Sequence, residues 1–416
     1  AAPDLPPVNR DAYEVIRDEA ALQARLDRAD ARGVVAIDTE TTGLNEMTAE
    51  LVGVCLCVEP GEAAYLPLAH RAEGGDGLFE NGARAEWQMP MDRALEMLKP
   101  MLEDPAILKV GQNLKYDSKI FARLGLRVDP IDDTMLLSYA MHAGLHGHGM
   151  DTLAERYLTH TCVSIKELIG SGKAQITFDR VPVDKAAIYA AEDADVTMRL
   201  WRTFKPQLHR ARVTTVYETM ERPLIPVLAA MEMRGIQVDR DVLSRMSAAF
   251  AQKMAGLEAE IHELAGETFN VGSPKQLGEI LFERMGFEGG KKGKAGAWST
   301  PADVLEDLAT LHDLPARVLD WRALSKLKST YTDALQDHIN PATGRVHTSY
   351  SIAGASTGRL ASTDPNLQNI PVRTEEGRRI REAFVAAPGK VLVSLDYSQI
   401  ELRILAHIAG IDALKE

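Results

Sequence analysis

The sequence has little of what marks a secreted or membrane-spanning protein. It contains three cysteines, and no apolar run reaches the length that spans a membrane. The N-terminus lacks the cationic-then-apolar pattern of a secretory signal. Cys55 and Cys57 lie inside an apolar run typical of a buried strand. A Cys-x-Cys metal fragment is the alternative, but no second cluster accompanies it. We therefore expect a cytoplasmic protein with buried thiols and no disulfide framework.

The chain also lacks an excess of positive charge, since its formal net charge is −13. An acidic balance argues against a nucleic-acid partner, because phosphate contacts need lysine and arginine. Net charge says little about local patches, however. Basic residues gather in three places: Lys291, Lys292 and Lys294; Arg322, Lys326 and Lys328; and Arg373, Arg378, Arg379 and Arg381. A charge run is usually a solvated face, so these patches gain meaning only from their context.

The pattern along the 416 residues predicts two or three domains. Residues 1–10 have the composition of an extended linker. In residues 11–205, strand-like runs alternate with helical stretches, which favours an α/β sheet domain. Residues 206–344 are almost wholly helical. Strand-like runs return in residues 345–416, and the run that leads to Asp396 is expected to be a buried strand that turns into a helix.

One long helix is expected within the helical part. Apolar residues recur there at spacings of three and four, which predicts a packed face, and Asp239 is a plausible N-cap. The residues of this stripe are Leu243, Met246, Phe250, Met254, Leu257, Ile261 and Leu264. Such a stripe is most often core packing, and we interpret it in that way.

Four acidic residues in the first part of the chain are spaced for a metal site. Asp38 and Glu40 stand two apart at the end of an expected strand, so both point to one face. Asp117 follows a second strand, in the first turn of a helix. Asp193 lies four residues after Tyr189 on one helix face. Converging carboxylates repel each other, and bound Mg²⁺ or Mn²⁺ would compensate that repulsion.

Each of these fragments alone is more often ordinary strand or helix. Together with Thr39, Gly43, Gln112 and Asn113, they resemble the proofreading-type 3′→5′ exonucleases over residues 11–205. The resemblance implies a ribonuclease H-like mixed sheet with helices, and two divalent metal ions.

The same resemblance implies a role for each site residue. Asp38, Glu40 and Asp193 would hold the metal that carries the attacking water, and Asp38 would bridge to a second metal, with Asp117 bonded to it through water. Tyr189 would orient the water. The contacts to the DNA strand end would come from Leu44, as an apolar wedge beside the terminal base, and from Gln112 and Asn113. Leu44 could also be a turn-packing leucine.

Three stretches in the last third carry a second resemblance. They are residues 325–331 (SKLKSTY), 356–371 (STGRLASTDPNLQNIP) and 396–403 (DYSQIELR). In this order they resemble the family A DNA polymerases. That resemblance covers the whole chain and implies a helical thumb over residues 206–344, followed by the beginning of an α+β palm over residues 345–416.

The polymerase resemblance also assigns contacts to DNA and metal. The phosphate-contacting thumb tip would be Lys291, Lys292 and Lys294. Lys326 and Lys328 would follow the duplex backbone. Arg359, Asn366 and Gln368 would contact the minor groove and the primer end. The polymerase site would use Asp396 and the Tyr397 carbonyl as metal ligands, with Glu401 as a steric gate against a ribose 2′-hydroxyl. Without this context, Asp396 would be taken as a cap of the following helix and Glu401 as a residue on its exposed side.

The expected function is therefore template-directed DNA synthesis with proofreading in the complete protein, a bacterial, nucleoid-associated monomer that binds DNA and deoxynucleotides. The family's fingers helix and its second catalytic aspartate do not occur before Glu416, so this chain alone is expected to retain only the exonuclease. Apolar surface is expected around Val391 to Leu395. The alternatives are a stand-alone ribonuclease D-like exonuclease, which has no use for residues 356–371, and a non-catalytic DNA-binding remnant, which would not need the complete carboxylate set.

Overall fold

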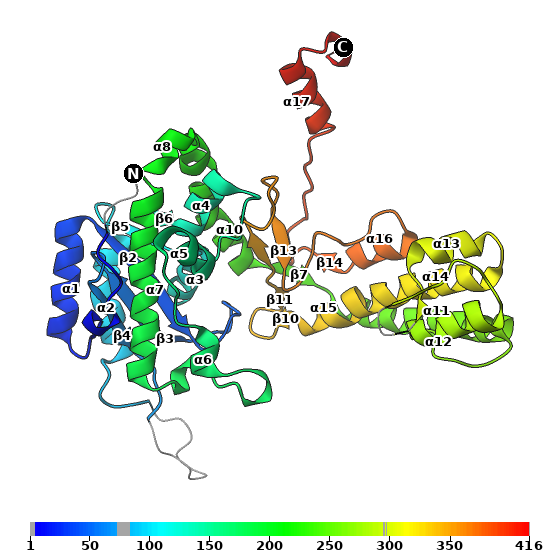
Figure 1. The fold of residues 1–416 in the computed structure, drawn as a ribbon, viewed down its shortest axis with the longest axis horizontal. Coiled ribbons are helices and arrows are strands. Elements are labelled where there is room, and N and C mark those ends of the chain that lie inside the picture. The colour runs from blue at the N-terminus through cyan, green and yellow to red at the C-terminus, as the bar shows by residue number, and fades with distance from the viewer. Residues whose placement is uncertain (1–4, 73–83, 294–295, 297, 416) are drawn as a thin grey trace. The chain divides into compact units, whose positions relative to one another are not determined.

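The computed structural model describes residues 5–72, 84–293, 296 and 298–415. It divides into two compact units, one of residues 1–235 with 347–368 and one of residues 236–346 with 369–416. Figure 1 shows the elements of both. These units do not coincide with the expected boundaries, because residues 206–235 and 347–368 pack with the α/β unit and not with the helical one.

A mixed sheet forms the centre of the first unit (Figure 1), and its six strands have the order β1-β4-β3-β2-β5-β6. Strand β2 pairs antiparallel with β3 and parallel with β5. The strands are β1 Glu14–Val15, β2 Val34–Thr41, β3 Leu51–Cys57, β4 Ala63–Pro67, β5 Leu108–Gly111 and β6 Ile131–Asp133. The expected α/β fold with a mixed sheet is confirmed.

Both faces of this sheet are covered by helices, because its strands are apolar on both sides. Strand β3 shows the alternation: Cys55 and Cys57 face a core that includes helix α7, Val183–Phe204, whereas Val54 and Leu56 face the core under α1, α2 and α3. Both thiols are fully buried, as the sequence predicted. The other helices of the unit are α1 Glu19–Arg32, α2 Met91–Glu103, α3 Leu114–Arg123, α4 Thr134–His142, α5 Met150–Leu158, α6 Ile165–Ile169, α8 Gln207–Ala211, α9 Thr214–Val216 and α10 Arg222–Arg234.

The short hairpin of β12, Ser349–Ser351, and β13, Ala361–Thr363, also belongs to the first unit. It is formed by residues far along the chain from the six-stranded sheet. Its neighbour in the unit is α10, which in turn packs against α3. The π-helical segment η4, Tyr217–Glu221, leads into α10.

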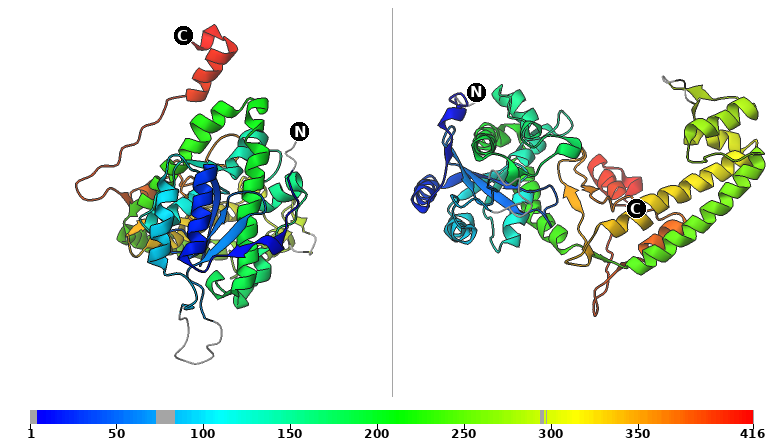
Figure 2. Two further views of the ribbon diagram at one scale, coloured as in Figure 1. Left: turned by 90° about the vertical axis from the view of Figure 1, so that its left-hand side faces the viewer. Right: turned by 90° about the horizontal axis from the view of Figure 1, so that it is seen from below.

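The second unit is mainly helical, and its longest helix is the expected one. Helix α11, Arg240–Ala265, begins at Asp239, whose carboxylate accepts hydrogen bonds from the backbone N–H groups of Asp241 and Val242, so the predicted cap is confirmed. Figure 2 shows α11 and α14, Asp313–Leu327, running side by side. Also present are α12 Pro274–Gly278, η5 Glu279–Arg284, α13 Ala302–Ala309, η6 Lys328–Asp333, α15 Ala334–Asp337 and α16 Glu375–Arg381.

Small sheets complete the second unit. A four-stranded sheet has the order β10-β11-β7-β14, and β8 pairs with β9. Their bounds are β7 Ile236–Val238, β8 Lys291–Lys292, β9 Trp298–Ser299, β10 Ile339–Asn340, β11 Arg345–Val346 and β14 Phe384–Val385. In the described part of the chain, no helix is both long enough and apolar enough to cross a membrane.

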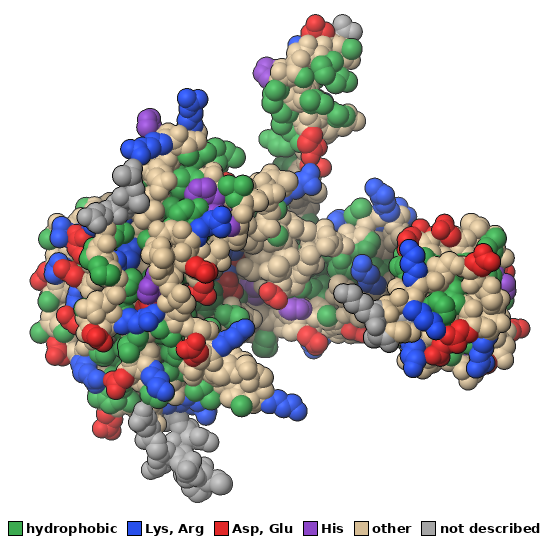
Figure 3. Space-filling model, viewed as in Figure 1, with side chains coloured by type: hydrophobic (Ala, Val, Ile, Leu, Met, Phe, Trp, Pro, Cys, Tyr) green, Lys and Arg blue, Asp and Glu red, His purple; other side chains and the backbone are tan. Residues whose placement is uncertain are grey.

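The segment before Asp396 departs from expectation. The sequence predicts a buried strand there, but residues 391–397 are irregular and exposed, and helix α17, Ile400–Ala409, follows. A strand needs neighbours that accept its backbone hydrogen bonds, and no described strand pairs with this segment. Val391 is 81% exposed and Leu395 is 91% exposed, so the expected apolar surface is present. Apolar side chains also gather on α17 (Figure 3).

Candidate active site

Strand β2 brings Asp38 and Glu40 to one face of the sheet, as period two predicts. Glu40 is buried and Asp38 is half-buried. Cys55 lies directly opposite Asp38 on β3, so its thiol joins the same face. Ligand atoms of these three side chains lie within 4.8 Å of one another. The sequence did not indicate Cys55 as part of the site, because the β2–β3 register cannot be read from one strand.

Asp117 reaches the same place from the first turn of helix α3. Its Oδ1 accepts hydrogen bonds from the backbone N–H of Thr39, at 3.0 Å, and from the Thr39 hydroxyl, at 2.5 Å. Thr39 lies between Asp38 and Glu40 in sequence. The strand that carries two of the carboxylates therefore also holds the third.

Helix α7 supplies the remaining two predicted residues. The Tyr189 hydroxyl donates a hydrogen bond to the Asp193 carboxylate, which is buried. The expected spacing of four residues on one helix face is thus present. The negative charge of Asp193 raises the pKa of Asp38, so Asp193 lies beside the β2 carboxylates.

Burial raises the pKa of every carboxyl group in the cluster. Burial is the main cause for Asp38, Glu40 and Asp117, and the charges of neighbouring carboxylates add to it. Burial likewise raises the pKa of Asp193 to about 8, although the hydrogen bond from Tyr189 lowers it. Glu40 Oε1 is buried and has no hydrogen-bond partner. Each of these features disfavours an anionic cluster without a counter-charge.

A divalent cation fits this donor set. It would compensate the repulsion and satisfy the unpartnered Glu40 oxygen. Carboxylate oxygens suit hard cations such as Mg²⁺ and Mn²⁺. Burial and the nearby carboxylates raise the pKa of the Cys55 thiol, so Cys55 remains protonated and is a poor metal ligand.

The residues expected to contact a DNA strand end lie in different environments. Leu44 is 93% exposed, in the loop after β2. Asn113 is exposed and precedes α3 with a left-handed backbone, φ 61°. The Gln112 amide is buried: its Nε2 donates to the His148 carbonyl at 2.8 Å, and its Oε1 accepts from Thr134 at 2.5 Å.

The basic residues expected in the thumb are largely on the surface. Lys291 and Lys292 are exposed on β8, and Lys294 lies outside the described residues. The Lys292 ammonium sits 4.4 Å from the centre of the Trp298 ring. Lys326 is exposed near the end of α14, and Lys328 forms an ion pair with Asp333 at 2.6 Å.

The expected primer contacts belong to the first unit, whereas the polymerase metal ligands belong to the second. Arg359 and Asn366 are exposed, and the Gln368 amide bonds to the Ser362 N–H and to the Leu360 carbonyl. In the second unit, the residues predicted for the polymerase site are all exposed: Asp396, Tyr397 and Glu401. The alternative that Asp396 caps α17 is wrong, because Gln399 occupies the cap position.

A second group with metal-ligand spacing, His160, Cys162 and Glu192, was not predicted. Its carboxylate is already bonded: Glu192 accepts from His160 at 2.8 Å, from Arg10 at 2.7 Å and from the Val163 N–H at 2.7 Å. This group is therefore an ion-paired hydrogen-bond network. Arg10 falls in the expected linker 1–10, so the end of that segment is bound to the first unit and is not free.

Comparison with known proteins gives two matches to family models. A 3′-5′ exonuclease model matches residues 13–209, and a DNA polymerase family A model matches residues 240–416. The chain thus carries a 3′-5′ exonuclease segment ahead of a segment that belongs to DNA polymerase family A. Enzymes of both families use divalent metal ions.

Curated relatives and a solved structure agree with this assignment. DNA polymerase I of Rhizobium leguminosarum is 56% identical over 98% of this chain and 41% of the relative. DNA polymerase I of Pseudomonas aeruginosa is 46% identical over 97% of this chain and 44% of the relative. The chain thus spans about two fifths of the length of these relatives. The POL domain of Pol1 from M. smegmatis, solved in complex with DNA primer-template and dNTP, aligns with a TM-score of 0.75 at 29% identity, covering 96% of this chain and 64% of that one.

Proposed function

We propose that this chain is a metal-dependent 3′→5′ exonuclease that removes nucleotides from the 3′ end of single-stranded DNA. The observation that carries the proposal is the convergence of four carboxylates and Tyr189 from β2, α3 and α7. These carboxyl groups have raised pKa values and include an unpartnered buried oxygen on Glu40. The match of residues 13–209 to the exonuclease family supports the same reaction.

Two divalent cations, Mg²⁺ or Mn²⁺, would be held by the carboxylates. Asp38, Glu40 and Asp193 would hold the first, and Asp38 and Asp117 would help to hold the second. When bound, such ions supply an activated water and stabilise charge on the leaving 3′-oxygen. Thr39 fixes Asp117 by two hydrogen bonds, so that carboxylate is oriented before any substrate arrives.

Tyr189 is suited to orienting a water molecule and not to removing its proton. Burial and the neighbouring carboxylates raise the pKa of the Tyr189 hydroxyl far above neutrality, so it stays a neutral donor. We assign exposed Leu44 to the terminal base, as an apolar wedge, and Asn113 to the strand end. The buried amide of Gln112 would support the Asn113 contact indirectly, because it holds the backbone that joins the two residues.

The direct test is digestion of a 5′-labelled single strand by the purified chain with Mg²⁺. Asp38→Ala and Asp193→Ala are expected to lower the excision rate by about 10³-fold or more, as loss of a metal ligand should. Asp184→Ala, at an exposed position of α7, is the matched control and should retain the wild-type rate. Degradation that persists in both Asp38→Ala and Asp193→Ala would contradict the site assignment.

A second candidate activity is template-directed DNA synthesis by the longer protein to which such a segment would belong. It is supported by the family A match of residues 240–416 and by the neighbour solved with primer-template and dNTP. In that activity Asp396 and the Tyr397 carbonyl would bind metal, Glu401 would act as the steric gate, and deoxynucleotides would be substrates. DNA would be contacted by Lys291, Lys292, Lys294, Lys326, Lys328, Arg359, Asn366 and Gln368.

For this chain by itself we expect no nucleotide addition in a primer-extension assay. In the described part of the chain, neither group with metal-ligand spacing includes Asp396, and a two-metal site needs at least one more carboxylate. Observed extension would mean that another residue completes the polymerase site. Because the relatives come from bacteria, we further propose that the protein acts on DNA in the bacterial cytoplasm.

A further inference from the structure

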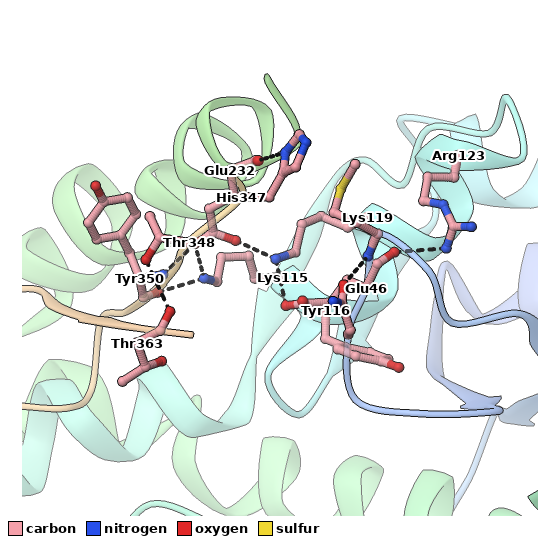
Figure 4. Close-up of polar contacts among 12 residues, drawn as sticks. Glu46, Lys115, Tyr116, Lys119, Arg123, Glu232, His347, Thr348, Tyr350 and Thr363 are labelled. Carbon is pink, nitrogen blue, oxygen red and sulfur yellow. Dashed lines mark hydrogen bonds and ion pairs between the residues drawn. The ribbon is translucent and has the colours of Figure 1, made fainter. Parts of the chain in front are cut away.

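A closed group of charges lies on the side of α3 that faces away from Asp117. Both carboxylate oxygens of Glu232, near the end of α10, accept hydrogen bonds from α3: one from Lys115 and the other from Lys119. Lys119 also pairs with Glu46 at 2.6 Å. Figure 4 shows these side chains pointing toward one another. Two ammonium groups and two carboxylates make the group electrically neutral, which suits its burial.

The same two residues, Lys115 and Glu232, hold a strand from far along the chain. Lys115 donates to the Tyr350 carbonyl at 2.6 Å, and the Tyr350 N–H donates to Glu232 at 2.7 Å. The His347 ring also bonds to the Glu232 carbonyl at 2.8 Å. Thus one carboxylate joins α3, α10 and β12, all within the first unit (Figure 4).

The position of these lysines on α3 relates them to the carboxylate site. Lys115 and Lys119 precede and follow Asp117 by two residues, which turns them about 200° away from it around the helix. Asp117 bonds to Thr39 of β2 on one side, while the lysines bond to Glu232 of α10 on the other. A carboxylate that binds two donors one turn apart restricts rotation of the helix about its axis. Apolar packing alone gives no such directional restraint.

We propose that Glu232 is a positioning residue for 3′-end excision, which fixes the rotation of α3 and thereby the place of the Asp117 carboxylate. This inference rests on the exonuclease function proposed above. It also means that residues 347–350, which fall inside the polymerase family match, stabilise the exonuclease site through Tyr350 and His347. The effect is expected on the rate of excision, since a displacement of about 1 Å at a reacting group can lower a rate 10²-fold.

Two substitutions separate positioning from other roles. Glu232→Gln keeps the side-chain volume and an acceptor for Tyr350 but removes the charge that holds both lysines. Glu232→Asp keeps the charge but is one methylene too short to reach all of its partners. Both are expected to lower kcat for single-strand excision by about 10-fold or more and to weaken Mn²⁺ binding by a similar factor, as the loss of outer-shell partners does. The loss in kcat should exceed any change in KM for the strand, because Leu44, the proposed contact to the terminal base, lies in the loop after β2 and not on α3.

Glu218→Gln provides the matched control. Glu218 also joins two cationic partners, Lys205 at 2.7 Å and Arg222, and neither of these lies on α3. Glu218→Gln should leave kcat and Mn²⁺ affinity within about twofold of wild type, because only contacts to α3 should affect the position of the metal ligand Asp117.

Mn²⁺ binding is measured by electron paramagnetic resonance, which needs no turnover, and the folded fraction by near-ultraviolet circular dichroism. A wild-type chain without excision would contradict the proposed function, while the Mn²⁺ titrations would still test the role of Glu232. The positioning role is overturned if both Glu232 variants match wild type in kcat and Mn²⁺ affinity. It is also overturned if their losses are no larger than their loss of folded protein.

Discussion

Two acidic regions of this molecule carry the same functional groups in opposite surroundings. Around Asp38, the carboxylates are buried or half-buried, their pKa values are raised, and Thr39 and Tyr189 hold two of them by hydrogen bonds. Around Asp396, the chain is irregular, and the apolar residues before it are exposed. Carboxylates thus form a cluster that could hold a metal ion only where several elements bring them together.

The surroundings of each region also determine whether its carboxylates are held in place before metal or DNA binds. The first region is fixed by a six-stranded sheet and by helices on both of its faces, so its geometry exists before metal or DNA binds. The Asp396 segment has no described neighbour strand to satisfy its backbone. Preorganisation of this kind is the main source of electrostatic catalysis.

The largest expected contrast is in excision. Asp117→Ala should lower the rate of single-strand excision by about 10²- to 10³-fold, because a preoriented charged group is lost. Asp396→Ala should change that rate by less than about twofold, since Asp396 belongs to the second unit and the carboxylate site to the first. Rates on a 5′-labelled oligonucleotide check both. A large effect of Asp396→Ala on excision would break the comparison.

A second contrast concerns packing. Phe121 of α3 is fully buried in the core under the sheet, so Phe121→Ala should lower the free energy of unfolding by about 3–5 kcal/mol. Leu395→Ala, at an exposed position, should lower it by less than about 0.5 kcal/mol. Urea titrations followed by circular dichroism measure both values. Similar losses at the two positions would show that residues 391–396 are packed in solution.

The third contrast depends on pH. In the unfolded chain Asp193 ionises near 3.8, whereas burial raises its pKa to about 8 in the folded, metal-free state. Folding therefore takes up a proton between these values, and the free energy of unfolding should fall as the pH rises from about 4 through 8. One pKa unit corresponds to about 1.4 kcal/mol, so the slope is measurable.

Mg²⁺ or Mn²⁺ should reverse that loss, because the cations bind the ionised carboxylates. Urea titrations at several pH values, with chelator or with metal, provide the measurement. A metal-free stability that does not change with pH, or that rises over this range, would contradict the raised pKa values.

The smallest expected change in stability is at the apolar surface before Asp396. Leu395→Asp should leave the free energy of unfolding within about 0.5 kcal/mol of wild type, since the side chain has no packing to lose. It should lower self-association, because exposed contiguous apolar surface promotes it. Light scattering over a concentration series checks the second effect. Unchanged self-association in this variant would show that residues around Leu395 do not mediate it.

Local sequence patterns predicted which residues of the carboxylate cluster lie together within one strand or helix. Period two placed Asp38 and Glu40 together, and a spacing of four placed Tyr189 with Asp193, because these relations lie within one element. Cys55 was missed, since its place opposite Asp38 depends on the register of β2 with β3. Glu232 was missed for a similar reason: its partners on α3 and β12 are more than a hundred residues away in the chain.

The same limit explains the wrong prediction near Asp396. The apolar run before it has the composition of a buried strand, but burial depends on partners that local composition does not describe. The boundaries of the two units show the same limit. Residues 347–368 join the first unit through contacts with α10 and α3, and no local sequence pattern predicts those contacts.

Four properties can be recognised from the sequence alone: the acidic residues, their spacing along strands and helices, the long capped helix α11, and the two family resemblances. Those properties are local, because they follow from the periods of single elements and from short ordered motifs. Only the tertiary structure decided which acidic residues meet, which are buried strongly enough to raise their pKa values, and which residue holds α3 in place. Those properties depend on contacts between distant segments, and such contacts arise when separate elements pack against one another.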